Sequence, residues 1–169
     1  MRTLANTMAL AAFVAAAGCT PVRNGINPPT PTDSVGLRGT WQLVAINTRW
    51  SDGRMSQPWG PAPIGQLTYA ADGRMTALLM DDRRNQANGQ PVPADVQANV
   101  AAYYGTYAVD SLRHTVTHHV VASIRASEAG AIERTYRLKG DTLVLTAAAI
   151  YEGASVIHTL VWHRVAQLR

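Results

Sequence analysis

The pair His118-His119 is the most suggestive place for chemistry in the sequence. Adjacent residues of a β-strand point to opposite faces, so a regular strand directs only one of these two side chains into a given site. His114 shares a face with His118, but two pleats separate them, which is a long distance for one metal ion. Three interpretations stay open: an interior histidine bonded to Tyr or Thr neighbours, a polar contact to an organic ligand, or a metal or haem ligand. No carboxylate or cysteine pattern accompanies the histidines, so we expect no metal and no cofactor.

The segments around these histidines have the pattern of short strands joined by tight turns. Asp72-Gly73 is a strong hairpin signal, and Lys139-Gly140-Asp141 separates another close pair of strands. Pro93-Ala94-Asp95 suits the start of one short helix, with Val96, Val100 and Tyr103 on one face. Eight strands are expected, at 41–46, 64–69, 74–80, 103–110, 115–124, 132–138, 142–148 and 156–165.

Eight antiparallel strands in a meander expose two edges unless the sheet closes on itself. Closure of eight strands gives a small barrel whose interior can hold one small ligand. The sequence therefore predicts an all-β fold: an eight-stranded antiparallel up-and-down barrel with one short helix.

The alternation along each expected strand selects the side chains that face the barrel interior. Apolar and aromatic walls with a few polar groups are typical of a small-ligand site. We therefore interpret the following inward set as the candidate ligand-binding cavity, with no catalytic residue assigned: Tyr69, Tyr107, His118, Arg134, Tyr136, His158 and Trp162.

Gly39-Thr40-Trp41 is similar to the Gly-x-Trp signature in the first strand of lipocalins. The segments 64–80, 103–107, 115–120 and 159–164 also resemble, in order, the bacterial lipocalin-like domain family. The resemblance implies an eight-stranded barrel with an internal cavity and says little about activity. Trp41 and Arg164 match the pair that packs at one end of classical lipocalins. A guanidinium on an indole face is favourable by about 0.5 to 2 kcal/mol, so we expect these two residues to close the barrel rather than bind a ligand.

The N-terminus has the three parts of a secretory signal: Met1-Arg2, an apolar run at 8–15, and Ala16-Ala17-Gly18-Cys19. This ending resembles the lipobox of bacterial lipoproteins, which implies cleavage after residue 18 and lipidation of Cys19. A thioether-linked diacylglycerol with a further palmitate-type chain on the freed amine would anchor the protein firmly in a bilayer. Thr20, rather than Asp, follows the cysteine, so we expect the outer membrane, facing the periplasm. Residues 19–36 are rich in Pro and Gly and are expected to form a tether, leaving 37–169 as the barrel domain.

The composition excludes several other classes of protein. Hydrophobic residues make up 47% of the 169 residues and charged residues 15%, which argues against a wholly disordered chain. The net charge of +4 is scattered, so no nucleic-acid partner is expected. No G-x-S-x-G elbow or phosphate-binding Gly-rich loop occurs in the sequence. The cluster Asp81-Asp82-Arg83-Arg84 is interpreted as a solvated loop.

Two functional hypotheses follow, and we favour the first. In the first, a membrane-tethered barrel binds a small apolar or aromatic molecule without catalysis. In the second, the barrel is an isomerase or cyclase acting on a small organic substrate, with His118, Tyr107 and Arg134 as acid, base and charge-stabilising groups. A structural envelope role is a third reading, and it predicts a barrel packed solid with side chains.

Overall fold

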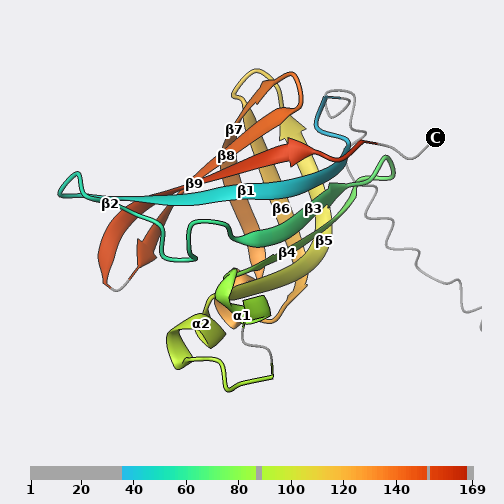
Figure 1. Cartoon of the computed structure of the whole chain (residues 1–169). Coiled ribbons are helices and arrows are strands. Elements are labelled where there is room, and N and C mark those ends of the chain that lie inside the picture. Colours follow the sequence, from blue (N-terminus) through green and yellow to red (C-terminus); the bar gives the residue numbers. More distant parts are fainter. Residues whose placement is uncertain (1–35, 87–88, 152, 167–169) are drawn as a thin grey trace, which may run out of the picture.

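The computed structural model describes residues 36–86, 89–151 and 153–166. The expected signal peptide, the lipidation site Cys19 and the tether up to residue 35 lie outside the described residues. The described part is one antiparallel sheet that curls into a barrel (Figure 1).

Eight long strands form the barrel, and each pairs with the next in chain order. The first strand also pairs with the last along nearly its whole length, from Trp41↔Arg164 to Trp50↔Val156, which closes the sheet and removes its edges. The prediction of an eight-stranded up-and-down barrel is thereby confirmed. A two-residue strand, β2, adds to the outer end of β1 at Thr48↔Ser56. The strands are β1 (Gly39–Trp50), β2 (Met55–Ser56), β3 (Ile64–Tyr69), β4 (Arg74–Met80), β5 (Val100–Asp110), β6 (Thr115–Ser123), β7 (Gly130–Lys139), β8 (Thr142–Tyr151) and β9 (Ala154–Arg164).

The helical insert differs from the sequence prediction. Two short helices, α1 (Arg83–Gln86) and α2 (Ala94–Ala98), occupy the β4–β5 connection, where one helix was expected. Helix α2 begins at the predicted position and buries Val96, but Val100 and Tyr103 belong to β5 and not to a helix face. The backbone hydrogen bonds of these residues go to β4, with Met80 opposite Val100, so sheet pairing ends the helix early.

The connections divide the barrel into two different ends. The turns β3–β4, β5–β6 and β7–β8, together with the start of β1 and the end of β9, lie at what we call the closed end. The connections β1–β3, β4–β5, β6–β7 and β8–β9 lie at the opposite, open end, where Figure 1 shows α1 and α2 at the bottom of the view. The β6–β7 connection contains a turn of 3-10 helix, η2 (Ala126–Glu128).

Arg164 and Trp41 seal the closed end. The Arg164 guanidinium lies over the Trp41 ring, 4.0 Å from the ring centroid, and donates hydrogen bonds to the carbonyls of Arg38 and Gly36 at 2.6 and 2.8 Å. The Trp41 indole donates to the carbonyl of Leu37 at 2.9 Å. The first and last strands are therefore joined by side chains as well as by their ladder.

A bulge in β1 changes which side of that strand faces inward. The pairing with β9 shifts between Leu43 and Ala45, so the buried positions change from odd to even numbers and continue with Ile46 and Thr48. Such a bulge bends the strand and increases its twist, as barrel closure requires. It places Thr48, a fully buried hydroxyl, inside the open half of the barrel.

Candidate functional site

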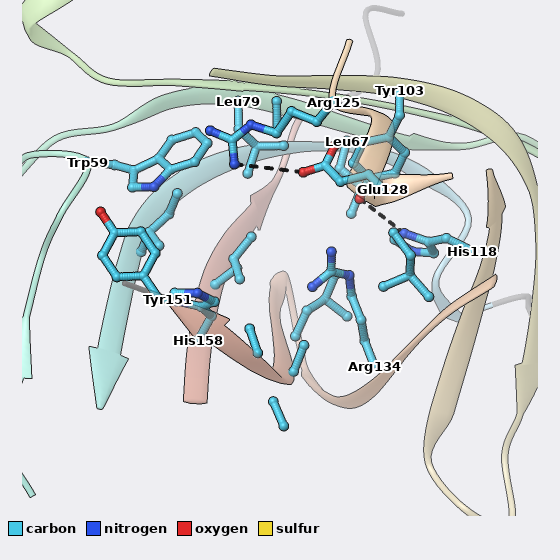
Figure 2. A pocket seen from close by; sticks show the side chains of 18 of the residues that line it. Trp59, Leu67, Leu79, Tyr103, His118, Arg125, Glu128, Arg134, Tyr151 and His158 are labelled. Atoms are coloured by element: carbon cyan, nitrogen blue, oxygen red, sulfur yellow. Dashed lines mark hydrogen bonds and ion pairs between the residues drawn. The ribbon is translucent and has the colours of Figure 1, made fainter. Parts of the chain in front are cut away.

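The interior of the barrel holds a cavity of about 310 Å³ on the side of the open end. Its wall is mostly apolar, which suits the body of a small organic molecule. At its rim lie Trp59 from the β1–β3 connection, Arg125 and Glu128 from the β6–β7 connection, and Tyr151 at the end of β8 (Figure 2). The apolar side chains of the wall include Ile46, Leu67, Leu79, Leu145, Ala147 and Leu160.

Four of the seven predicted cavity residues line this space: His118, Arg134, His158 and Trp162. They come from β6, β7 and β9, and the inward phase of each strand agrees with the alternation in the sequence.

The other three predicted residues are not part of the cavity wall. Tyr69 and Tyr107 are buried side by side, with ring centroids 4.6 Å apart, and the Tyr107 hydroxyl donates to the carbonyl of Ala70 in the β3–β4 turn. Tyr136 is half-buried and its ring meets the edge of His114, 5.8 Å away. These tyrosines have the predicted inward direction but lie toward the closed end, where they fill the barrel.

His118 faces the interior and His119 is exposed. Both ring nitrogens of His118 are engaged: Nε2 lies 2.6 Å from the hydroxyl of Tyr69, and Nδ1 lies 3.2 Å from the hydroxyl of Tyr103. Burial lowers the pKa of His118 well below its usual range, and the positive charge of Arg134 lowers it further. The imidazole is therefore neutral, with one N–H donor and one acceptor nitrogen.

The hydrogen-bond partners decide which nitrogen of His118 carries the proton. Tyr69 is completely buried, and burial raises the pKa of its phenol, so its hydroxyl keeps the proton and must donate it. Among the described residues the Tyr69 hydroxyl has a hydrogen-bond partner only in His118, so it donates to Nε2. Nδ1 then carries the imidazole proton and donates to Tyr103. This assignment leaves the hydroxyl proton of Tyr103, a residue of the cavity wall, free to be donated into the cavity.

A second histidine, His158, lies across the cavity on β9. Its Nδ1 is 2.8 Å from the hydroxyl of the buried Thr48 on β1, and its ring meets the edge of Tyr151. Burial lowers the pKa of His158, and Arg134 adds to the effect. Both cavity histidines are thus held neutral near pH 7, largely because they are shielded from water.

Two donors of the cavity wall have no acceptor among the described residues. The Arg134 guanidinium projects into the space between His118 and His158 in the view of Figure 2, and it forms no hydrogen bond or ion pair with a described residue. The indole N–H of Trp162 is buried, and no acceptor in the described part of the chain reaches it. An unpaired buried donor such as the Trp162 indole costs about 1 to 3 kcal/mol, so this N–H and the half-buried Arg134 guanidinium are both suited to bind an acceptor brought by a ligand.

Sequence reasoning missed Tyr103 and the rim. Tyr103 shares its inward phase with Gly105 and Tyr107, which was the signal available, but as the first residue of the expected strand 103–110 it was also placed on the helix face and was left out of the inward set. Trp59 and Arg125 lie on irregular connections without periodicity, so no pattern could place them. The Arg125 guanidinium lies 5.4 Å from the centroid of the Trp59 ring.

The interpretation of 81–84 as a solvated loop is wrong for its first two residues. Asp81 and Asp82 are buried, and Asp81 forms a 2.7 Å ion pair with Arg83 and accepts a hydrogen bond from Asn99. The Arg83 hydrogen bond is the main reason that the pKa of Asp81 falls to about 2. Asn99 also donates to the carbonyl of Pro58, so this cluster joins the β4–β5 connection to the segment that carries the rim residue Trp59.

Comparison with known proteins agrees with the architecture. The family model described as a lipocalin-like domain matches residues 38–165. The chain belongs to the lipocalin-like domain family. None of the curated proteins matches the sequence significantly. The family resemblance in the sequence is confirmed over nearly the whole barrel.

Two further features of this lipocalin-like barrel concern ions and membranes. Within the described residues, no three His, Cys, Asp or Glu side chains come together in an arrangement that could hold a metal ion. The helices of the described part are all too short or too polar to cross a bilayer.

Proposed function

We propose that this lipocalin-like protein binds a small apolar or aromatic molecule in its barrel and is held at the bacterial cell envelope by lipidated Cys19. The observation that carries the binding proposal is the cavity itself. A barrel of purely structural role would be filled with side chains, whereas here about 310 Å³ is left open beneath the rim. This volume lies at the lower end of the range for small-molecule sites.

The chemistry of the wall favours binding over catalysis. Turnover by an isomerase or cyclase would need a base with a free lone pair facing the substrate. In His118, the residue proposed for that task, both nitrogens are already bonded to tyrosines. Tyr107, the second candidate, lies outside the cavity wall and donates to Ala70. These contacts support a carrier or sequestering role.

The binding proposal is tested by native mass spectrometry of the barrel domain and by filling the cavity. Ala147 alternates with the buried Leu143 and Leu145 on β8 and lines the cavity. Ala147→Phe should remove any co-purifying ligand mass, while Ala131→Phe, at an exposed position of β7, should retain it. A mass equal to the bare chain in repeated preparations of the unaltered protein would contradict the proposal.

The anchoring proposal rests on the sequence around Cys19 and on where the barrel begins. Gly36 lies at the closed end, bonded to Arg164, so the expected tether joins the barrel opposite the rim of the cavity. We expect Cys19→Ser to abolish labelling by palmitate and to release the protein from outer-membrane fractions. Unchanged labelling and fractionation of that variant would refute lipidation at this residue.

A further inference from the structure

The polar groups of the cavity wall are mainly hydrogen-bond donors that lack acceptors. Arg134 supplies a guanidinium without a partner among the described residues, and Trp162 supplies a buried indole N–H. Tyr103 supplies a hydroxyl proton. Its oxygen accepts from Nδ1 of His118, whose Nε2 accepts from Tyr69, so the Tyr103 proton is not used within this group. Three donors from three different strands, β5, β7 and β9, therefore line one space.

The carboxylate of the same wall is already engaged. Among the residues that line the cavity, Glu128 is the only carboxylate, and it lies at the rim. Its Oε2 accepts a hydrogen bond from Ser123 at 2.8 Å, and its Oε1 lies 4.0 Å from Arg125. Arg134 is not within ion-pair distance of it. The deeper part of the cavity thus carries one positive charge that no described residue neutralises.

The surroundings of Arg134 make that charge consequential. The positive charge of Arg134 lowers the pKa of both His118 and His158, and both histidines are neutral. A half-buried cation next to apolar walls is poorly solvated compared with one in water, so pairing with an anion stabilises it. A guanidinium offers a planar fork of donors that matches the two oxygens of a carboxylate.

We propose that the ligand of this cavity is an organic acid: a small molecule with an apolar or aromatic body whose carboxylate pairs with Arg134. The carboxylate accepts from the guanidinium, and the neighbouring donors Tyr103 and Trp162 bind further oxygens of the ligand. The apolar body lies against the leucine and alanine side chains of β3, β4 and β8. This inference rests on the proposed binding function and adds the charge and head group of the ligand.

The test compares two probes of the same shape, 3-phenylpropanoate and the uncharged 3-phenylpropanamide, by isothermal titration calorimetry at pH 7. We expect the carboxylate to bind the unaltered protein at least about tenfold more tightly than the amide, since hydrogen bonds to charged groups are the stronger ones. Arg134→Gln should remove that preference and leave the affinity for the amide unchanged. The indole N–H resonance of Trp162 should shift on addition of the carboxylate.

Two further variants keep the result interpretable. Arg137→Gln removes the same charge from an exposed position of β7, three residues along, and should keep the preference. Arg134→Lys keeps the positive charge and should retain most of the preference for the carboxylate. It thereby distinguishes loss of the charge from misfolding as the cause of any effect in Arg134→Gln. Equal binding of the two probes, or an unchanged preference in Arg134→Gln, would overturn the organic-acid proposal while leaving small-molecule binding intact. Failure of both probes to bind, with no ligand mass on the native protein, would overturn the binding function itself.

Discussion

Removal of the Arg164 guanidinium should destabilise the barrel more than removal of any exposed ion pair. In Arg164→Gln the protein loses the stacking on Trp41, worth about 0.5 to 2 kcal/mol. It also loses two hydrogen bonds from the charged guanidinium to the carbonyls of Arg38 and Gly36. Hydrogen bonds to charged groups are worth about 1.5 to 3 kcal/mol. Water reaches part of this site, which reduces their contribution here. Together these terms give a loss of about 3 kcal/mol in the free energy of unfolding.

The ion pair of Arg164 with Asp141 provides the matched control. The Nε–Oδ1 distance is 3.3 Å, but the Asp141 side chain is 66% exposed, so the pair contributes about 0 to 1 kcal/mol. Asp141→Asn should therefore cost less than about 1 kcal/mol. For a domain of this size, about 3 kcal/mol corresponds to a fall of about 10 °C in Tm.

Urea unfolding followed by tryptophan fluorescence measures both variants on the same signal. If Arg164→Gln were no less stable than Asp141→Asn, the idea that this guanidinium ties the first strand to the last would be refuted. Ligand affinity gives a second criterion, because the pair lies at the end of the barrel opposite the cavity rim. Loss of binding with unchanged stability would show that Trp41 and Arg164 act on the ligand instead.

Two other predictions concern buried polar groups. Tyr69→Phe leaves Nε2 of His118 without a donor, so we expect a loss of about 1 to 3 kcal/mol in urea unfolding, and a value near zero would contradict the hydrogen-bond assignment. The pKa of Asp81 is about 2, against an ordinary 3.8, so its ionised form stabilises the folded state by about 2 kcal/mol above pH 4. That stabilisation is complete above the unfolded-state pKa and is lost as the pH falls toward 2. The stability difference between the unaltered protein and Asp81→Asn should therefore shrink on acidification, and a difference that is constant from pH 6 to pH 2 would contradict this assignment.

The local pattern of the sequence was sufficient for the eight long strands and for the inward faces of most of them, although not for β1, where a bulge switches the inward side. Alternation with a period of two depends only on the pleat of each strand, so it placed His118 in the candidate inward set, but a bulge would have reversed the two histidines and only the structure decided that His118 faces inward. Turn residues such as Asp72-Gly73 marked where the chain reverses. Because every strand pairs with its neighbour in sequence, these local signals were enough to predict the barrel.

The tertiary structure alone decided which inward side chains meet. Alternation predicts on which side of a strand a side chain lies, but not how deep in the barrel that side chain lies. The depth along the barrel axis is set by the tilt and stagger of the strands in the closed sheet. Tyr107 and Arg134 have the same inward direction, yet one packs near the closed end and the other reaches the cavity. The burial of Asp81 and the rim position of Trp59 depend on contacts between connections far apart in the chain, and no local pattern encodes such contacts. The sequence by itself thus determined the barrel and its inward residues, whereas the open space and its unpaired donors arise only when the strands close around it.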